Sequence, residues 1–213
     1  MNIISHRGYW KTTEEKNKLE AFSRSFSLGF GTETDVRDYC GELVISHDIP
    51  IGNEISFESF LSVYSSFKID SPLALNIKAD GLQDKIESAL SRYDIHNAFV
   101  FDMSVPDELI YLKNTKNNVY SRCSEFEQDV AFYDSCSGIW LDCFNSIWYD
   151  DSIIKKFIND GKSVCVVSSE LHKRDETLAH WTLLKKWNLV NESNLILCTD
   201  LPEQASEFFK ESL

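Results

Sequence analysis

The sequence predicts an α/β fold, a single (β/α)₈ barrel with a small insertion after the second strand. Short β-rich runs alternate with amphipathic stretches along the chain, and the β-rich runs number eight. The 213 residues contain no low-complexity stretch and no linker rich in Pro, Gly or Ser. This length fits one domain over residues 1–213 and is at the low end for such a barrel, so we expect short loops.

The predicted strands are short runs rich in β-branched and aromatic residues. They cover residues 2–5, 32–37, 73–78, 98–103, 118–121, 138–142, 163–167 and 194–198. A further run at residues 43–46 follows the turn at Cys40-Gly41 and predicts the insertion.

The stretches between these runs carry apolar residues at helical spacing, so we expect a helix after each strand. The clearest sets are Leu19, Phe22 and Phe26; Phe57, Phe60, Leu61 and Tyr64; Leu82, Ile86, Ala89 and Leu90; Ile153, Ile154, Phe157 and Ile158; and a final helix over residues 203–211.

Composition narrows the function classes. The net charge of −13 argues against nucleic acid as a partner, because phosphate backbones require a basic surface. No apolar run approaches the roughly 18–20 residues that span a bilayer, and we expect no membrane span. Residues 1–4 lead directly into a histidine motif with no signal-peptide pattern, so we expect a cytoplasmic protein whose six scattered cysteines are buried free thiols.

Polar residues collect where the predicted strands end. In a (β/α)₈ barrel the chemistry lies at the carboxyl ends of the strands. The residues that the predicted boundaries place there are His6, Glu33, Asp35, His47, Asn76, Lys78, Asp102, Asp142 and Asp200.

The acid pair and the two histidines indicate phosphate chemistry. Glu33 and Asp35 are two residues apart in a strand, so both face one side, where two carboxylates suit a divalent cation such as Mg²⁺ or Ca²⁺. A solvated acid pair on an exposed edge strand is the alternative. His6 and His47 are candidates for general acid and base.

Two cations complete the candidate site. Arg7, beside His6, offers a forked donor for a phosphate, and Lys78 adds a second positive charge on the interior face. The alternative interpretation of Lys78 is a strand-end lysine that reaches solvent.

Taken together, these motifs resemble the glycerophosphodiester phosphodiesterase family, whose barrel belongs with phospholipase C-like phosphodiesterases specific for phosphatidylinositol. The matching residues are His6-Arg7-Gly8, Asn17, Ala21-Phe22, Gly29, Glu33-x-Asp35-Val36, Leu43-Val44-x-x-His47-Asp48, Asn76-Ile77-Lys78 and Thr199-Asp200-x-Pro202. The resemblance is dense over residues 3–78 and returns at residues 195–202.

The resemblance implies a TIM barrel that hydrolyses a small phosphodiester joining an alcohol to glycerol phosphate, with a divalent metal, Mg²⁺ or Ca²⁺. It assigns acid–base catalysis to His6 and His47, phosphate contact to Lys78 and metal binding to Glu33 and Asp35. The third metal position falls on Asn76. Related sphingomyelinase D-type enzymes use a similar set of groups for transfer or cyclisation, and the sequence does not separate these products.

The chain departs from the family pattern at three places. Asn76 stands where the family has a glutamate, and Lys16 where it has an acid. The candidates to replace the lost ligand are Glu20, Asp102, Asp142 and Glu170, of which Asp102 is favoured. Residues 167–174 replace a usual Trp-Thr pair, and this stretch either binds a second anionic group of the substrate or is a polar surface loop. The alternative function is therefore a barrel that binds a phosphorylated ligand with weakened or lost metal-dependent turnover.

Overall fold

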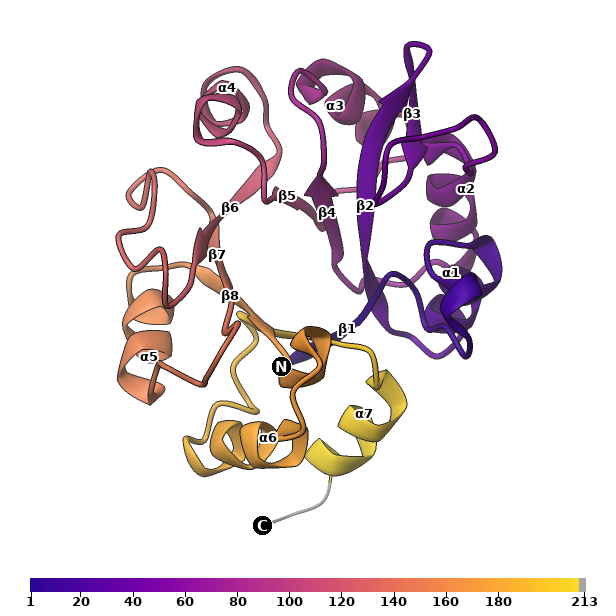
Figure 1. Ribbon diagram of the computed structural model, residues 1–213. Helices are drawn as coiled ribbons and strands as arrows, with labels where there is room; N and C mark the ends of the chain where they lie inside the picture. The colour runs from indigo at the N-terminus through magenta and orange to yellow at the C-terminus, as the bar shows by residue number, and fades with distance from the viewer. Residues whose placement is uncertain (211–213) are drawn as a thin grey trace.

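The computed structural model describes residues 1–210, in which eight parallel strands close into a barrel (Figure 1). The first strand closes the ring because it pairs with both the second and the last. In spatial order the barrel strands are β1 (Asn2–His6), β9 (Leu195–Thr199), β8 (Ser163–Val167), β7 (Gly138–Leu141), β6 (Asn118–Cys123), β5 (Ala98–Phe101), β4 (Leu73–Ile77) and β2 (Gly31–Tyr39). The predicted (β/α)₈ barrel is confirmed.

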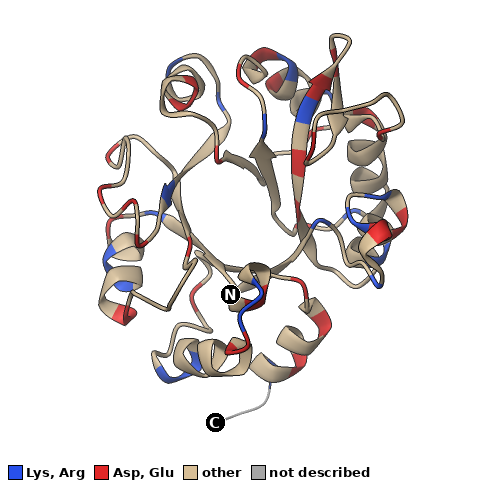
Figure 2. Cartoon of the chain, in the orientation of Figure 1, with Lys and Arg blue, Asp and Glu red and all other residues tan. Residues whose placement is uncertain are grey.

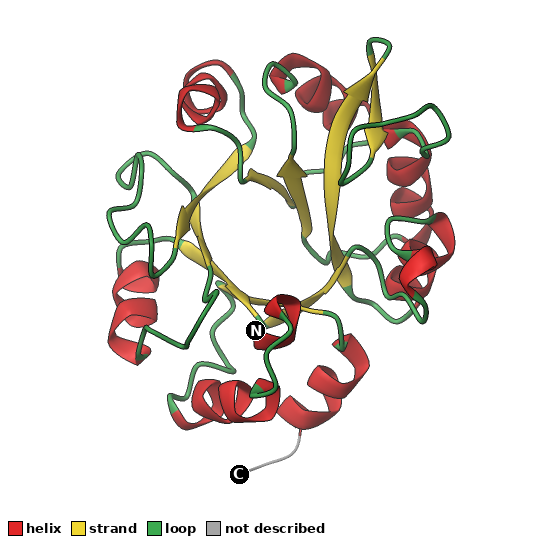
Figure 3. Ribbon diagram, in the orientation of Figure 1, coloured by secondary structure: helices red, strands yellow, loops and turns green. Residues whose placement is uncertain are grey.

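Helices form an outer ring around the strands (Figure 3). They are α1 (Leu19–Ser27), α2 (Phe57–Phe67), α3 (Gln83–Arg92), α4 (Val105–Asn114), α5 (Asp151–Asn159), α6 (Thr177–Lys186) and α7 (Pro202–Lys210), with the short 3₁₀ helices η1 (Thr13–Glu15) and η2 (Ser169–His172). Several begin with a capping side chain: Ser56, Ser104 and Asp150 accept hydrogen bonds from backbone N–H groups in the first turns of α2, α4 and α5.

One expected helix is absent from the described chain. Residues 124–137, between β6 and β7, form turns and irregular backbone, so the prediction of a helix after every strand is wrong at this position. Ser124 and Glu127 bridge each other across a tight turn, and residues 134–137 are rich in side chains that compete for backbone hydrogen bonds.

The predicted insertion after the second strand is a hairpin. Strand β3 (Glu42–Ile45) runs antiparallel to the long outer half of β2, with Val36 opposite Ile45 and Tyr39 opposite Glu42. Cys40 and Gly41 form the turn, both with positive φ. The hairpin carries the chain past the barrel mouth and delivers residues 46–48 beside it.

The apolar core lies in two places. Most buried apolar residues pack between the strands and the surrounding helices, as Phe22 and Phe60 do with ring centroids 4.7 Å apart. A separate cluster fills the barrel interior, where Phe99 stacks on Tyr120 and Phe101 on Trp140, each pair at 3.8 Å. These rings plug the barrel, so polar side chains above them lie at its carboxyl end.

The burial of the cysteines and the character of the helices bear on two expectations from the composition. Five of the six cysteines are buried, whereas Cys40 is exposed on the hairpin turn. Within residues 1–210, no helix has both the length and the apolar character needed to cross a membrane. Acidic and basic residues are spread around the whole ring (Figure 2).

Candidate active site

The acid pair lies on the inner face of β2. Glu33 and Asp35 are 1 % and 0 % exposed, while Val36 points outward into the helix-facing core. Strand register sets their neighbours, because the Cα atom of Glu33 pairs with that of His6 on β1, and Asp35 pairs with Asn76 on β4. The acid pair is therefore buried rather than solvated on an edge strand.

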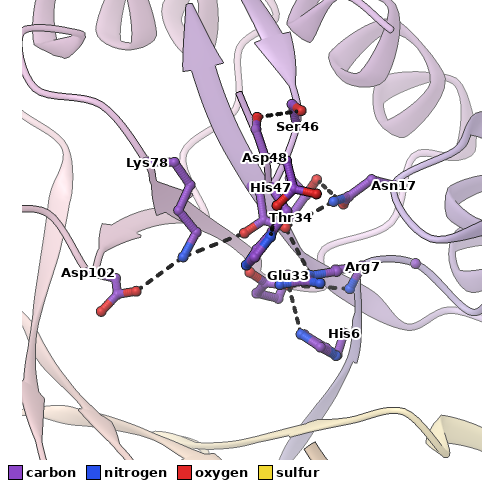
Figure 4. Close-up of polar contacts among 12 residues, drawn as sticks. His6, Arg7, Asn17, Glu33, Thr34, Ser46, His47, Asp48, Lys78 and Asp102 are labelled. Atoms are coloured by element: carbon purple, nitrogen blue, oxygen red, sulfur yellow. Dashed lines mark hydrogen bonds and ion pairs between the residues drawn. The ribbon is translucent and has the colours of Figure 1, made fainter. Parts of the chain in front are cut away.

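Two cations neutralise the Asp35 carboxylate, and the amide of a neighbouring residue donates a hydrogen bond to it. Arg7 Nε lies 2.9 Å from Asp35 Oδ2, and Lys78 Nζ lies 3.7 Å from Oδ1 (Figure 4). Asn17 Nδ2 donates to Asp35 Oδ2 at 2.9 Å, and Asn17 Oδ1 accepts from the Thr34 hydroxyl. A fully buried carboxylate requires such compensation, and Asp35 receives it from two cations and an amide.

Glu33 has weaker compensation. Its Oε2 accepts the Arg7 backbone N–H at 3.2 Å and lies 3.9 Å from His6 Nε2. Burial, followed by the nearby charge of Asp35, raises the pKa of Glu33 to about 7. A cation placed between Glu33 and Asp35 would oppose both effects.

His6 is fixed between two carboxyl groups. Its Nδ1 lies 2.8 Å from Asp200 Oδ1, and its Nε2 faces Glu33. Trp10 Nε1 donates to the same Asp200 oxygen at 3.3 Å. Asp200 follows β9, the strand adjacent to β1, so barrel closure brings together two residues 194 positions apart.

His47 is near the acid pair but makes a different kind of contact. It follows β3, and its Nδ1 lies 2.9 Å from Asp48 Oδ1, with the two side chains 48 % and 93 % exposed. His47 and Arg7 both line a surface cavity of about 530 Å³. The structure thus places His47 at the edge of the site, with about half of its side chain exposed.

Lys78 joins the acid pair to the neighbouring strands β5 and β6. Its Nζ contacts Asp102 Oδ2 at 3.3 Å, and Asp102 Oδ1 accepts from Arg122 at 2.7 Å. Asp102 is therefore paired with two cations, one from β4's end and one from β6. Lys78 is one-fifth exposed and faces inward, not outward to solvent.

The residues available for a metal are two carboxylates and an amide. Within residues 1–210, no group of three or more His, Cys, Asp or Glu side chains could hold an ion. Asp35 Oδ1 and Asn76 Oδ1 are nevertheless buried acceptor oxygens that lack a hydrogen-bond partner in the described chain. Paired in register beside Glu33, they form an oxygen set of the kind that Mg²⁺ and Ca²⁺ prefer, so the residues fit a divalent ion.

The backbone geometry of the His6-Arg7-Gly8 motif explains why its third residue is glycine. Arg7 and Gly8 have φ values of 59° and 82°, and a Cβ atom at Gly8 would lie 2.7 Å from the Ala21 side chain. Glycine is required there, because a side chain would clash and the left-handed conformation would be strained. The tight turn aims Arg7 back at Asp35.

Comparisons with known proteins identify the fold. No protein-family model and no curated protein matches the sequence. Many solved structures superpose on the chain, and three of them match it over nearly its whole length as follows. A candidate glycerophosphodiester phosphodiesterase from Galdieria sulphuraria is 15 % identical, with a TM-score of 0.76 over 99 % of this chain and 98 % of that one.

The second is a phosphodiesterase from Oleispira antarctica in complex with the product sn-glycerol-3-phosphate. It is 16 % identical, with a TM-score of 0.72 over 99 % of this chain and 97 % of that one. The third, a Ca²⁺-dependent phosphatidylinositol-specific phospholipase C from Streptomyces antibioticus, is 13 % identical, with a TM-score of 0.59 over 98 % and 96 %. The chain has the fold of these enzymes.

Proposed function

We propose that the protein is a metal-dependent phosphodiesterase of the glycerophosphodiester phosphodiesterase family. It hydrolyses a glycerophosphodiester, or a related small phosphodiester, to an alcohol and a phosphomonoester. One observation carries this proposal: His6, Glu33, Asp35 and Lys78 come from three neighbouring strands and meet at the carboxyl end of the barrel. The shared fold with phosphodiesterases supports it.

Arg7 and Lys78 bind the phosphate. A phosphodiester carries one negative charge that grows in the transition state, and preorganised cations stabilise that growth. In the free protein both cations contact Asp35, one on each carboxylate oxygen. Each side chain is about one-fifth exposed, so a phosphate can approach them from the mouth without unfolding the site.

Glu33, Asp35 and Asn76 would hold the divalent ion, which supplies positive charge next to the phosphate when bound. The acid pair alone carries at most two negative charges, and Asn76 adds a neutral oxygen. This donor set, with one neutral oxygen among its ligands, would hold the ion with modest affinity.

His6 and His47 move the protons. An attacking hydroxyl, from water or from the substrate itself, forms a bond to phosphorus while the bond to the leaving alcohol breaks. One histidine accepts the proton of the attacking group, and the other protonates the leaving alkoxide. Asp200 fixes the ring of His6 through Nδ1, which leaves Nε2 toward the substrate.

The test is a turnover assay over a panel of glycerophosphodiesters, with Mg²⁺, with Ca²⁺ and with a chelator. We expect release of alcohol that requires one of the two ions. Binding of a phosphorylated ligand without turnover under any condition would instead support the alternative of a phosphate-binding barrel.

A further inference from the structure

A second polar pair stands across the barrel mouth from the proposed catalytic groups. Asp142 follows β7, and His172 ends the turn η2 that follows β8; His172 Nε2 lies 2.5 Å from Asp142 Oδ1. Figure 1 draws η2 in orange, inside the ring of helices. The chemistry proposed above uses neither residue.

Strand order places this pair opposite the phosphate-binding side. Within the closed ring of eight, β7 lies opposite β2 and β8 lies opposite β4. Trp140 and Cys165 on these strands point into the barrel, so Asp142, two residues beyond Trp140, also points inward. Burial, with smaller effects from the Glu33 and Asp142 carboxylates, raises the pKa of the Cys165 thiol, consistent with a thiol lying between the two acids.

The pair is rigidly built. Asp142 is 6 % exposed, and its Oδ1 also accepts the Cys143 backbone N–H at 2.8 Å. Trp148 Nε1 donates to the Asp142 carbonyl at 2.8 Å. The His172 ring packs against Phe144 with centroids 4.6 Å apart, and 22 % of its side chain remains exposed.

One ring nitrogen of His172 is available. Nε2 is engaged by Asp142, whereas Nδ1 has no hydrogen-bond partner among residues 1–210. A partly exposed ring that a buried carboxylate holds through one nitrogen, with the other nitrogen unpaired, is typical of a group that orients a ligand.

We propose that His172, oriented by Asp142, binds a free hydroxyl of the substrate through Nδ1 and thereby selects phosphodiesters whose glycerol or alcohol arm is hydroxylated. This inference rests on the proposed function for the location of the phosphate. The proposal gives the stretch at residues 167–174 a role in binding a hydroxyl group. The sequence alone suggested that this stretch either binds an anionic group of the substrate or is a polar surface loop.

The charges around the ring favour a neutral ligand over a charged one. An anionic group at Nδ1 would face the Asp142 carboxylate at the same ring, with Glu125 nearby on the backbone of Phe144. Arg174, two residues after His172, donates to the Cys143 carbonyl at 2.6 Å and adds a positive charge to the same segment. A hydroxyl both donates and accepts, so it matches Nδ1 in either protonation state of the ring.

The test measures binding by titration calorimetry, with and without added Mg²⁺. The two probes are sn-glycerol 3-phosphate and propyl phosphate, which share the phosphate but differ in hydroxyl groups. We expect the protein to prefer glycerol phosphate by about five- to tenfold, the worth of one net hydrogen bond. His172→Ala should remove this preference while leaving the affinity for propyl phosphate unchanged, and His172→Asn, with a polar atom near the Nδ1 position, should retain part of it.

His96 provides a matched control. Its Nε2 makes a similar contact with Asp94, at 2.8 Å, but it precedes β5 and so lies at the opposite end of the barrel. His96→Ala should leave both affinities unchanged. The ¹⁵N signal of His172 Nδ1 should shift with glycerol phosphate and not with propyl phosphate.

Several outcomes would overturn the proposal. These are equal affinity for the two probes, an equal loss of both affinities in His172→Ala, or no binding of either probe. Failure of the proposed function is distinguishable, because it appears as absence of turnover in a protein that still discriminates between the probes.

Discussion

Replacement of His180 should change how the stability of the protein depends on pH. This histidine is fully buried beneath η2, with Tyr149 Oη 2.7 Å from Nε2 and Ser169 Oγ 2.8 Å from Nδ1. Burial, with a smaller effect from Arg174, lowers its pKa from 6.5 to about 4. The folded protein therefore resists a proton that the unfolded chain accepts readily.

The direction and size of the effect follow from linkage. At about pH 7.5 and above the ring is neutral in both states, and the stabilisation is fully present. As pH falls from about 6.5 to about 4, the unfolded state binds the proton first, so the free energy of unfolding decreases. A shift of this size amounts to about 3 kcal/mol in total, of which about 2 kcal/mol is lost between roughly pH 7.5 and pH 5.

The assay compares the natural protein with His180→Gln, which keeps polar atoms but does not titrate. Urea denaturation followed by tryptophan fluorescence gives the free energy of unfolding at each pH. Glu33 acts in the opposite sense, because its raised pKa favours the folded state as pH falls, but it is present in both proteins and cancels. The variant should lose about 2 kcal/mol less than the natural protein over this range. Equal losses would refute the reasoning.

Three further predictions concern the site and the core. Asn76→Glu should tighten Mg²⁺ or Ca²⁺ binding in calorimetry, because a carboxylate replaces a buried amide oxygen; unchanged affinity would place residue 76 outside the ion's ligands. Asp200→Ala should lower kcat by about 10- to 100-fold with little change in KM, since His6 loses its orienting partner. Asp200→Asn, which keeps an oxygen that can accept from His6 Nδ1, should recover much of this loss. Phe60→Ala should reduce the free energy of unfolding by about 3–5 kcal/mol, because the ring is fully buried among aromatic neighbours; a loss under about 1 kcal/mol would contradict this packing.

The strands could be predicted because a parallel barrel buries both of their faces. Such strands are continuous β-branched and aromatic runs, and Ser163–Val167 is a clear case. The absent helix between β6 and β7 could not be predicted by the same alternation. In residues 124–137, turn-forming side chains decide the backbone, and Phe126 stays 70 % exposed rather than packing on the barrel.

The candidate site was predictable where alternation and strand ends determine it. Glu33, Asp35 and Asn76 share the inner face because of period-two geometry and register. The contact between His6 and Asp200 depends on closure of the ring, which no local pattern encodes. The pairing of Asp102 with Lys78 and Arg122 was missed, because strand-end position alone does not say which neighbour a carboxylate selects.

The central claim is that two histidines perform acid–base catalysis on a phosphodiester. The most direct measurement is the rate of alcohol release from a glycerophosphodiester, with the divalent ion present, for His6→Ala, His47→Ala and the control His96→Ala. We expect each of the first two variants to lose about 10²–10⁴-fold in kcat, and the control, at an 82 % exposed side chain, to keep full activity. A loss of less than about tenfold in either of the first two would contradict the assignment.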